Sequence, residues 1–252
     1  MSGRPDSSNT AIAVVIGRAG SKGLPGKNAL PLLDEPMIRH TIRDGLEAKR
    51  VDRVIVSTDG EEIAAAADSM GVTVVRRLAE LAGDAAPVDA PVRHALREIG
   101  SEHGVVVVLY ANVPVRPAGL IDRAIGTLIE TGADSVQSYA PVGKHHPNWM
   151  VRIDGRGAVS PYAETKAFRR QDLEPLFLPD GGVIVVRRAA LEAAAPDEPA
   201  SFFGRDRRAI INEPGAVVDI DEPFDLLVAE QKLSTRQQEG APARALDLPG
   251  NT

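Results

Sequence analysis

Apolar runs and amphipathic stretches alternate through the first half of this chain. Continuous apolar runs predict buried strands at residues 11–16, 53–57, 72–75, 105–110 and 134–139. Apolar residues at helical spacing predict intervening helices over residues 36–49, 61–70, 87–99 and 117–131. Strands that are apolar on both faces and separated by helices predict a mostly parallel sheet with helices on both sides, a three-layer, doubly wound α/β fold.

This alternation breaks after Pro141. Residues 141–180 contain a His-His-Pro run, a turn and a polar stretch without apolar periodicity, which predicts an inserted arm with little core of its own. Regular structure is then predicted to resume, with strands at 182–187 and 216–221 and a helix at 223–232.

These elements predict one domain over residues 11–233. We expect residues 1–10 and 234–252 to be disordered, because the first segment is polar and the second is rich in Gln, Gly, Pro and Ala.

The composition excludes several classes of protein. The 252 residues contain no cysteine, which excludes disulfides and thiolate metal sites. No apolar run approaches the roughly 18–20 residues of a membrane helix, and a net charge of -6 argues against general nucleic-acid binding. The first ten residues do not resemble a signal peptide. We therefore expect a cytoplasmic protein with neither membrane nor nucleic acid as a partner.

The segment after the first predicted strand is rich in glycine and positive charge. Residues 17–28 read Gly-Arg-Ala-Gly-Ser-Lys-Gly-Leu-Pro-Gly-Lys-Asn and contain no acid. Glycine lets backbone N–H groups approach an anion, and Arg18, Lys22 and Lys27 can neutralise it, so the segment predicts a phosphate-binding loop. Ligands of such sheets bind at the carboxyl ends of strands, where this loop lies. Its glycine spacing matches neither a Walker A loop nor the dinucleotide fingerprint.

Two aspartates alternate at the end of a predicted strand. Asp219 and Asp221 therefore point to the same side, and neighbouring carboxylates repel unless a cation lies between them. Hard oxygen ligands suit Mg²⁺. The residues alone favour equally a solvated strand end in which Asp221 caps the following helix.

Six segments, in order, resemble the acylneuraminate cytidylyltransferases, the CMP-sialic acid synthetase family, over about residues 11–232. They are residues 18–28, 54–59, 77–84, 144–147, 169–171 and 219–221. The resemblance implies a fold of the nucleotide-diphospho-sugar transferase type. It also implies that CMP is transferred from CTP to a nine-carbon 2-keto sugar acid with release of pyrophosphate. Magnesium dependence follows from it too, as does a homodimer in which an arm reaches over the neighbouring site; residues 141–180 are the candidate arm.

The same resemblance assigns roles to residues. It implies that CTP is bound by Arg18, Ser21, Lys22, Lys27, Asn28 and Arg77. It implies that Asp219 and Asp221 hold the metal, and we interpret Lys22, Arg18 and Asp221 as the catalytic groups. For the sugar acid the candidates are Lys144, His145, Arg170, Gln171 and Asp180.

The chain departs from the family mainly in its sugar-binding half. Tyr110 and Asn112 replace a glutamine and a threonine of the family's Gln-Pro-Thr-Ser-Pro-Leu-Arg run, and Leu178 and Asp180 replace the arginine and asparagine of an Arg-Pro-Asn-Gly run. An added Asp180 repels an anionic substrate unless it meets a hydroxyl, an ammonium or a metal. Legionaminate, pseudaminate or a deaminated relative are therefore open as acceptors, beside N-acetylneuraminate.

Two other functions are alternatives. One is a 3-deoxy-manno-octulosonate or other sugar nucleotidyltransferase, and the other is a non-catalytic nucleotide-binding domain. The adjacent residues His145 and His146 point to opposite sides of an extended segment, so they are poorly placed to bind one zinc ion together. Asp59, which precedes a predicted helix, is typical of a turn or a helix cap.

Overall fold

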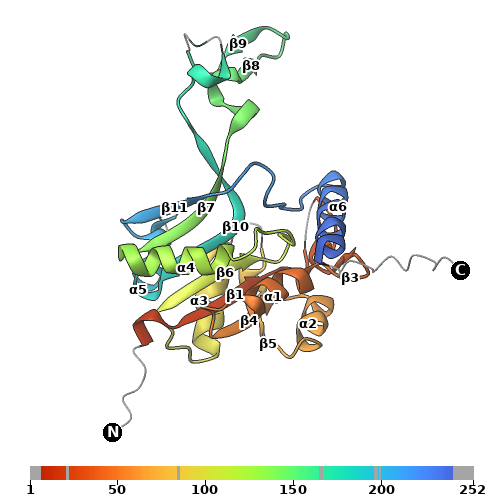
Figure 1. Cartoon of the computed structure of the whole chain (residues 1–252), viewed down its shortest axis with the longest axis vertical. Helices are drawn as coiled ribbons and strands as arrows, with labels where there is room; N and C mark the ends of the chain where they lie inside the picture. The colour runs from red at the N-terminus through yellow and green to blue at the C-terminus, as the bar shows by residue number, and fades with distance from the viewer. Residues whose placement is uncertain are drawn as a thin grey trace, which may run out of the picture.

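The computed structural model describes residues 7–20, 23–83, 86–164, 167, 169–195, 198 and 200–240. Its centre is a seven-stranded sheet with the strand order β11-β7-β10-β6-β1-β4-β5 (Figure 1). The strands are β1 (Ala11–Ile16), β4 (Arg53–Thr58), β5 (Thr73–Arg76), β6 (Val105–Tyr110), β7 (Ser135–Pro141), β10 (Phe177–Arg187) and β11 (Arg207–Ile211). All neighbours are parallel except β10, which is antiparallel to β6 and β7.

Helices cover both faces of the sheet. On one face, Ala11, Ala13 and Val15 of β1 pack with residues of α1 (Ile38–Glu47), α2 (Glu61–Asp68) and α4 (Leu120–Thr131). On the other face, Ile12 and Val14 pack with α3 (Asp89–Glu98) and α5 (Arg188–Ala193). Alternate residues of one strand thus enter two separate cores, which requires an apolar run without polar alternation. The predicted three-layer, mostly parallel fold is confirmed.

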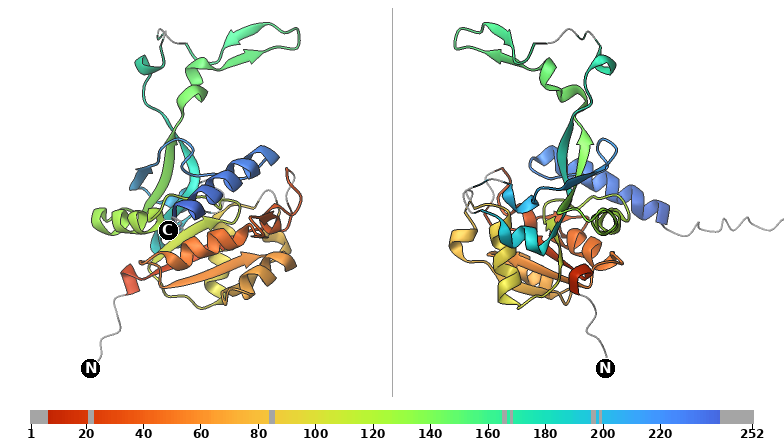
Figure 2. Two further views of the ribbon diagram at one scale, coloured as in Figure 1. Left: turned by 45° about the vertical axis from the view of Figure 1, so that its right-hand side comes forward. Right: turned by 90° about the vertical axis from the view of Figure 1, so that its left-hand side faces the viewer.

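The predicted arm projects from this body (Figures 1 and 2). Its stalk is the antiparallel pairing of β7 with the first half of β10, in which Phe177 pairs with Pro141. Beyond the stalk, the strands β8 (Val151–Ile153) and β9 (Val159–Pro161) form a hairpin. Every residue of these two strands is exposed, so the arm has no apolar core in this region.

The C-terminal helix is longer than predicted. α6 spans Pro223–Gly240, so the prediction of a disordered tail is wrong for residues 234–240. Leu226 and Leu233 of α6 pack on a third core with Leu32, Met37 and Ile220, which stabilises the helix beyond the predicted end. Residues 241–252 lie outside the described part. The predicted disorder of residues 1–10 also fails at Ser7–Asn9, which form a 3-10 turn.

Other differences concern short elements. The predicted strand at 216–221 does not form: residues 216 and 217 are bends, and the segment makes a single bridge, between Val218 and Val115. The helix predicted from residue 117 begins at Leu120, after Gly119 in the left-handed conformation. The hairpin of β2 (Pro31–Leu32) and β3 (Glu35–Pro36), as well as α5 and β11, had not been predicted. No helix among the described residues is both long enough and apolar enough to cross a membrane.

Candidate active site

A pocket of about 380 Å³ opens at the carboxyl ends of β1 and β6. One side is polar and is lined by Arg18, Lys27, Asn28, Asn112 and Asp221. Another part of the lining is apolar and consists of Leu81, Pro87, Val88 and Pro91. A site with a charged half and an apolar half suits a ligand that carries both a polyanion and a planar ring.

The glycine-rich loop lies against the end of the sheet at Gly17. A Cβ at Gly17 would be 2.8 Å from the Ala111 Cβ, so only glycine lets the loop leave β1 at this angle. The Ala19 backbone N–H donates to Asp59 Oδ1 at 2.9 Å. Asp59 therefore holds the loop from the neighbouring strand end. Asp59 does not cap α2, because the N-cap residue of this helix is Gly60 and no side chain makes a capping hydrogen bond there.

Asn28 is buried at the wall of the pocket, with 4% of its surface exposed. Its Nδ2 donates to the Arg18 carbonyl at 2.9 Å, which fixes the orientation of the amide. Its Oδ1 has no hydrogen-bond partner among the described residues. A buried acceptor without a partner is costly, so this oxygen is a natural acceptor for a donor on a ligand.

Lys27 joins the loop to the aspartate pair. Its Nζ donates to Asp221 Oδ1 at 2.6 Å and to the Ile220 carbonyl at 3.0 Å. The same segments also touch at Gly23, where a Cβ would lie 2.8 Å from the Asp221 carbonyl oxygen. The structure therefore brings together Lys27 and Asp221, which are 194 residues apart in the sequence. Ser21 and Lys22 of the loop lie outside the described residues.

Asp219 and Asp221 are close enough to interact electrically. Burial, followed by the charge of Asp221, raises the pKa of Asp219 to about 6, while Lys27 acts in the opposite direction. Asn112 Nδ2 donates to Asp219 Oδ1. Two mutually repelling carboxylates are a donor set that fits Mg²⁺, which binds one or two protein carboxylates and completes its shell with water and phosphate. Within the described ranges, no group of three or more His, Cys, Asp or Glu side chains is placed to hold a metal alone.

Arg77 lines the same pocket from the end of β5. Its Nη2 donates to the Ser57 carbonyl at 2.9 Å, and its Nε lies 3.4 Å from Ser57 Oγ. Burial lowers the pKa of Arg77, Asp59 raises it, and Arg18 lowers it further. The guanidinium is thus held in place beside Arg18, and the two arginines make this part of the pocket strongly cationic.

The residues predicted to bind the sugar acid are on the arm, away from this pocket. Lys144 and His145 are exposed in one 3-10 turn, and Gln171 is exposed in another that begins at Arg170. Figure 2 shows the arm projecting from the body, so a single chain does not bring these residues to Asp221. His146 is buried instead, with its Nε2 3.1 Å from the Glu174 carbonyl oxygen, which places the two histidines on opposite sides as predicted.

Asp180 does not fit the predicted role of a substrate contact. Its Oδ1 accepts from Ser138 Oγ at 2.5 Å and from the Gly182 N–H at 3.0 Å, and its Oδ2 accepts from Asn212 Nδ2 at 2.7 Å. Both oxygens are therefore engaged within the chain. The sequence predicts a hydroxyl, an ammonium or a metal beside the negative charge of Asp180. The structure places the Ser138 hydroxyl there, on the neighbouring strand β7.

Several pocket residues were missed as site residues by sequence reasoning. Tyr110 and Asn112 line the pocket, although they had been noted only as departures from the family. Burial, followed by the charge of Asp219, raises the pKa of Tyr110. Leu81 and Pro91 supply the apolar side and carry no local signal of function. Only their place beside the glycine-rich loop reveals them.

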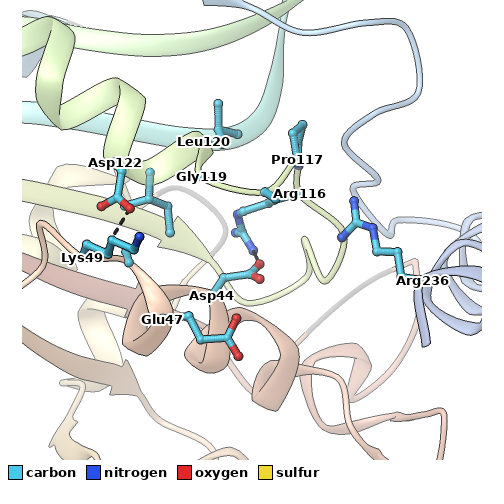
Figure 3. Close-up of a pocket in the computed structure, with 12 residues that line it drawn as sticks. Asp44, Glu47, Lys49, Arg116, Pro117, Gly119, Leu120, Asp122 and Arg236 are labelled. Atoms are coloured by element: carbon cyan, nitrogen blue, oxygen red, sulfur yellow. Dashed lines mark hydrogen bonds and ion pairs between the residues drawn. The ribbon is translucent and has the colours of Figure 1, made fainter. Parts of the chain in front are cut away.

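A larger pocket, of about 590 Å³, lies between α1, the start of α4 and α6 (Figure 3). Among its lining residues are Asp44, Glu47, Lys49, Arg116 and Arg236. It shares no lining residue with the pocket at Lys27. Its most buried charged group, Arg116, is engaged by bonds within the chain, so the smaller pocket is the candidate active site.

The chain is similar in sequence to known cytidylyltransferases. The family model described as cytidylyltransferase matches residues 12–173, more than half of the chain. An N-acylneuraminate cytidylyltransferase of Streptococcus agalactiae serotype III is 33% identical over 69% of this chain and 42% of its own length. The CMP-N,N'-diacetyllegionaminic acid synthase of Legionella pneumophila is 29% identical over 90% of this chain and 97% of its own.

A solved structure has the same fold. The CMP:2-keto-3-deoxy-manno-octonic acid synthetase complexed with CTP superposes with a TM-score of 0.67 over 90% of this chain and 99% of its own, at 17% identity. The chain spans about two-fifths to half of the first curated relatives that it matches. The family match covers the glycine-rich loop and the strands that carry it, and the chain therefore belongs to the cytidylyltransferase family.

Proposed function

We propose that this chain transfers CMP from CTP to the anomeric hydroxyl of a nine-carbon 2-keto sugar acid and releases pyrophosphate. The observation that carries the proposal is the contact of Lys27 with Asp221, which brings the cationic loop together with one member of the aspartate pair in the same pocket. The relatives in Streptococcus and Legionella support the class of acceptor, because their names specify nine-carbon sugar acids.

The pocket residues have distinct tasks in this reaction. Arg18, Lys22 and Lys27 neutralise the triphosphate, and Arg77 and Asn28 bind the nucleotide beside the apolar wall. The acceptor hydroxyl oxygen attacks the α-phosphorus and releases its proton to water, and the bond from this phosphorus to the pyrophosphate oxygen breaks. Negative charge grows on the leaving pyrophosphate, where fixed cations stabilise it. Lys22, by its place in the loop, is proposed to lie nearest to that group.

Magnesium is part of the proposal. Asp219 and Asp221 are its ligands, and their repulsion in the free protein favours a cation between them. When bound, the ion polarises the phosphate under attack and offsets its charge. Lys27 contacts Asp221 in the free protein, and we propose that it shifts toward the phosphates as nucleotide and metal enter.

A homodimer accounts for the distance between the arm and the pocket. The arm exposes large apolar side chains, among them Trp149 (41%), Ile153 (67%), Val159 (64%) and Tyr162 (52%). Exposed apolar clusters of this kind are typical of protein interfaces. We propose that the arm packs on a second copy and brings Lys144, His145, Arg170 and Gln171 to the partner's pocket, where an arginine suits a carboxylate. A cytoplasmic location, where CTP is made, completes the proposal.

Pyrophosphate release tests the reaction. The protein is incubated with Mg²⁺, each of the four nucleoside triphosphates, and a panel of 2-keto sugar acids that includes N-acetylneuraminate, legionaminate, pseudaminate and 3-deoxy-manno-octulosonate. We expect release with CTP and a nine-carbon acid only. A preference for the eight-carbon acid supports the rival transferase. No release with any acid, despite a thermal shift with CTP, supports a non-catalytic domain.

A further inference from the structure

We propose that Arg116, acting with Asp180, is a positioning residue that sets the place of the metal ligand Asp219. This inference rests on the proposed metal-dependent transfer. Neither residue lines the pocket at Lys27, so each acts through the backbone that it holds.

Arg116 is a buried guanidinium, 3% exposed, that binds three separate parts of the chain. Its Nε donates to the Gly182 carbonyl at 2.6 Å, and its Nη2 donates to the Tyr110 carbonyl at 3.1 Å. Its Nη1 donates to Thr41 Oγ1 and Asp44 Oδ2, both at 3.1 Å. Figure 3 shows the guanidinium directed at Asp44. One side chain therefore ties α1, the end of β6 and the middle of β10 together.

The segment held at Tyr110 contacts the proposed metal ligand through Asn112. Arg116 also donates to the Val113 carbonyl, so it binds on both sides of Asn112. The Ile220 N–H donates to the Asn112 carbonyl at 2.9 Å, and Asn112 Nδ2 donates to Asp219. These two hydrogen bonds connect the loop directly to Asp219 and its neighbour Ile220, so a displacement of the loop also displaces Asp219.

The second support comes from β10, whose register shifts between Pro179 and Ile184. Asp180 holds this bulge through Ser138, Asn212 and the Gly182 N–H, while Arg116 holds the Gly182 carbonyl. Gly181, with φ of +75°, lies beside Asp219, since a Cβ added at this glycine would be 3.3 Å from Asp219 Oδ2. Arg116 and Asp180 thus bind the two backbone groups of Gly182 and fix the turn at Gly181, which lies next to Asp219.

Lysine cannot replace Arg116 in this arrangement. A guanidinium offers five N–H donors in a rigid fork, whereas an ammonium offers three from one point. Arg116→Lys keeps the charge but cannot reach Gly182, Tyr110 and Asp44 together. Substitutions that disturb the support of a metal ligand weaken metal binding by about 10–100-fold. CTP binding without metal depends on the loop and Arg77, so we expect it to be retained.

The experiment measures two affinities and turnover in the full chain. Mn²⁺ affinity is read by electron paramagnetic resonance without nucleotide, and CTP affinity by calorimetry in EDTA. We expect Arg116→Lys to weaken Mn²⁺ binding about tenfold or more and to lower kcat, with CTP affinity within about twofold. Arg93→Lys is the matched control: Arg93 also binds two carbonyls, of Leu191 and Ala194, and a carboxylate, on the other face. Unchanged Mn²⁺ affinity, or an equal loss in Arg93→Lys, overturns the proposal.

A second pair of variants decides the matter if Arg116→Lys does not fold. Asp180→Ala is expected to weaken Mn²⁺ binding, and Asp180→Asn to restore most of it, because an amide oxygen still accepts from Ser138 and Gly182. Equal Mn²⁺ affinity in both and in the wild type overturns the positioning role. If the wild type releases no pyrophosphate with any acid, yet its Mn²⁺ affinity depends on Arg116, the proposed function fails and the positioning role stands.

Discussion

At the residue scale, Lys27 is the group whose role changed most between sequence and structure. In the sequence it is one of three cations in a loop, and in the structure it bonds to Asp221, on a distant segment. In the proposed reaction, Lys27 is shared between a carboxylate and an incoming phosphate and thus links metal, nucleotide and leaving group. It is therefore the residue on which a first substitution is most informative.

We predict that Lys27→Met lowers kcat/KM for CTP by about 10²-fold, because a group that stabilises the charge of the leaving pyrophosphate is lost. Steady-state pyrophosphate release measures this effect. Lys232→Met, on α6, is the control and is expected to retain normal activity. Normal activity in Lys27→Met contradicts the role of the contact.

Asn28 provides a separate prediction about binding. Asn28→Asp keeps the shape of the side chain, replaces the donor to the Arg18 carbonyl and adds a negative charge beside a triphosphate. We expect CTP to bind at least about tenfold more weakly, since about 1.4 kcal/mol of added repulsion is enough for a tenfold loss of affinity. Calorimetry measures the change. The control is Asn9→Asp, just before the amino end of β1, which should leave the CTP affinity unaltered.

At the element scale, turns at strand ends decide how the sheet is completed. Asp134 precedes β7, and its Oδ2 accepts from the N–H groups of Arg205 and Asp206, which lead into β11. Gly204 is required in this turn, because a Cβ there would be 2.4 Å from the Asp134 Cβ. The edge strand β11 thus depends on one carboxylate, a dependence that strand periodicity does not reveal.

The pH dependence of stability tests this turn. The N–H groups of Asp206 and Arg205 lower the pKa of Asp134 below its ordinary value of 3.8. A lowered folded-state pKa means that the ionised carboxylate stabilises the fold above pH 3.8, and that this contribution disappears as the pH falls through the folded-state value. We predict that Asp134→Ala lowers the free energy of unfolding at pH 7 by about 1 kcal/mol, and that wild type and variant converge on acidification.

Urea denaturation between pH 7 and pH 3 measures this convergence. Asp154→Ala is the matched control, since Asp154 also accepts two backbone N–H groups but in the turn of the exposed arm hairpin. It is expected to change global stability less. A difference for Asp134→Ala that persists unaltered at pH 3 shows that the carboxylate charge is not the cause.

At the scale of the whole molecule, the body and the arm follow different rules. The body buries its strands in two cores, one on each face of the sheet, whereas the arm leaves large apolar side chains in solvent. An arm of this kind is stable when a second surface covers it. The proposed sugar-acid residues are located on it, so association and acceptor use should be lost together.

We predict that the double substitution Ile153→Lys and Val159→Lys converts a dimer into a monomer, because charges on the hairpin oppose burial. Sedimentation equilibrium measures the mass, and pyrophosphate release measures activity. CTP binding should remain, since the nucleotide pocket lies within one chain. Leu46→Lys, at an exposed apolar position on α1, should leave the mass unchanged. A monomeric wild type that turns over sugar acid contradicts the proposed arrangement.

The sequence by itself determined the layers of the fold and the position of the glycine-rich loop. Strands such as residues 105–110 are apolar on both faces, and glycines and cations follow the first of them, so local composition was enough. It also singled out Asp219 and Asp221 as a pair, because alternate residues of extended chain share a side.

Only the tertiary structure decided which of these groups meet. Three sets of contacts join residues that are far apart in the sequence. They are the contact of Lys27 with Asp221, the hydrogen bond of Arg116 to Gly182, and the hydrogen bonds that Asp180 accepts from Ser138 and Asn212. No local pattern encodes such pairs, because they depend on the order in which strands associate and on where a bulge falls. The length of α6 followed the same rule: its polar last turns are helical because the preceding turns pack on a core contributed by other segments.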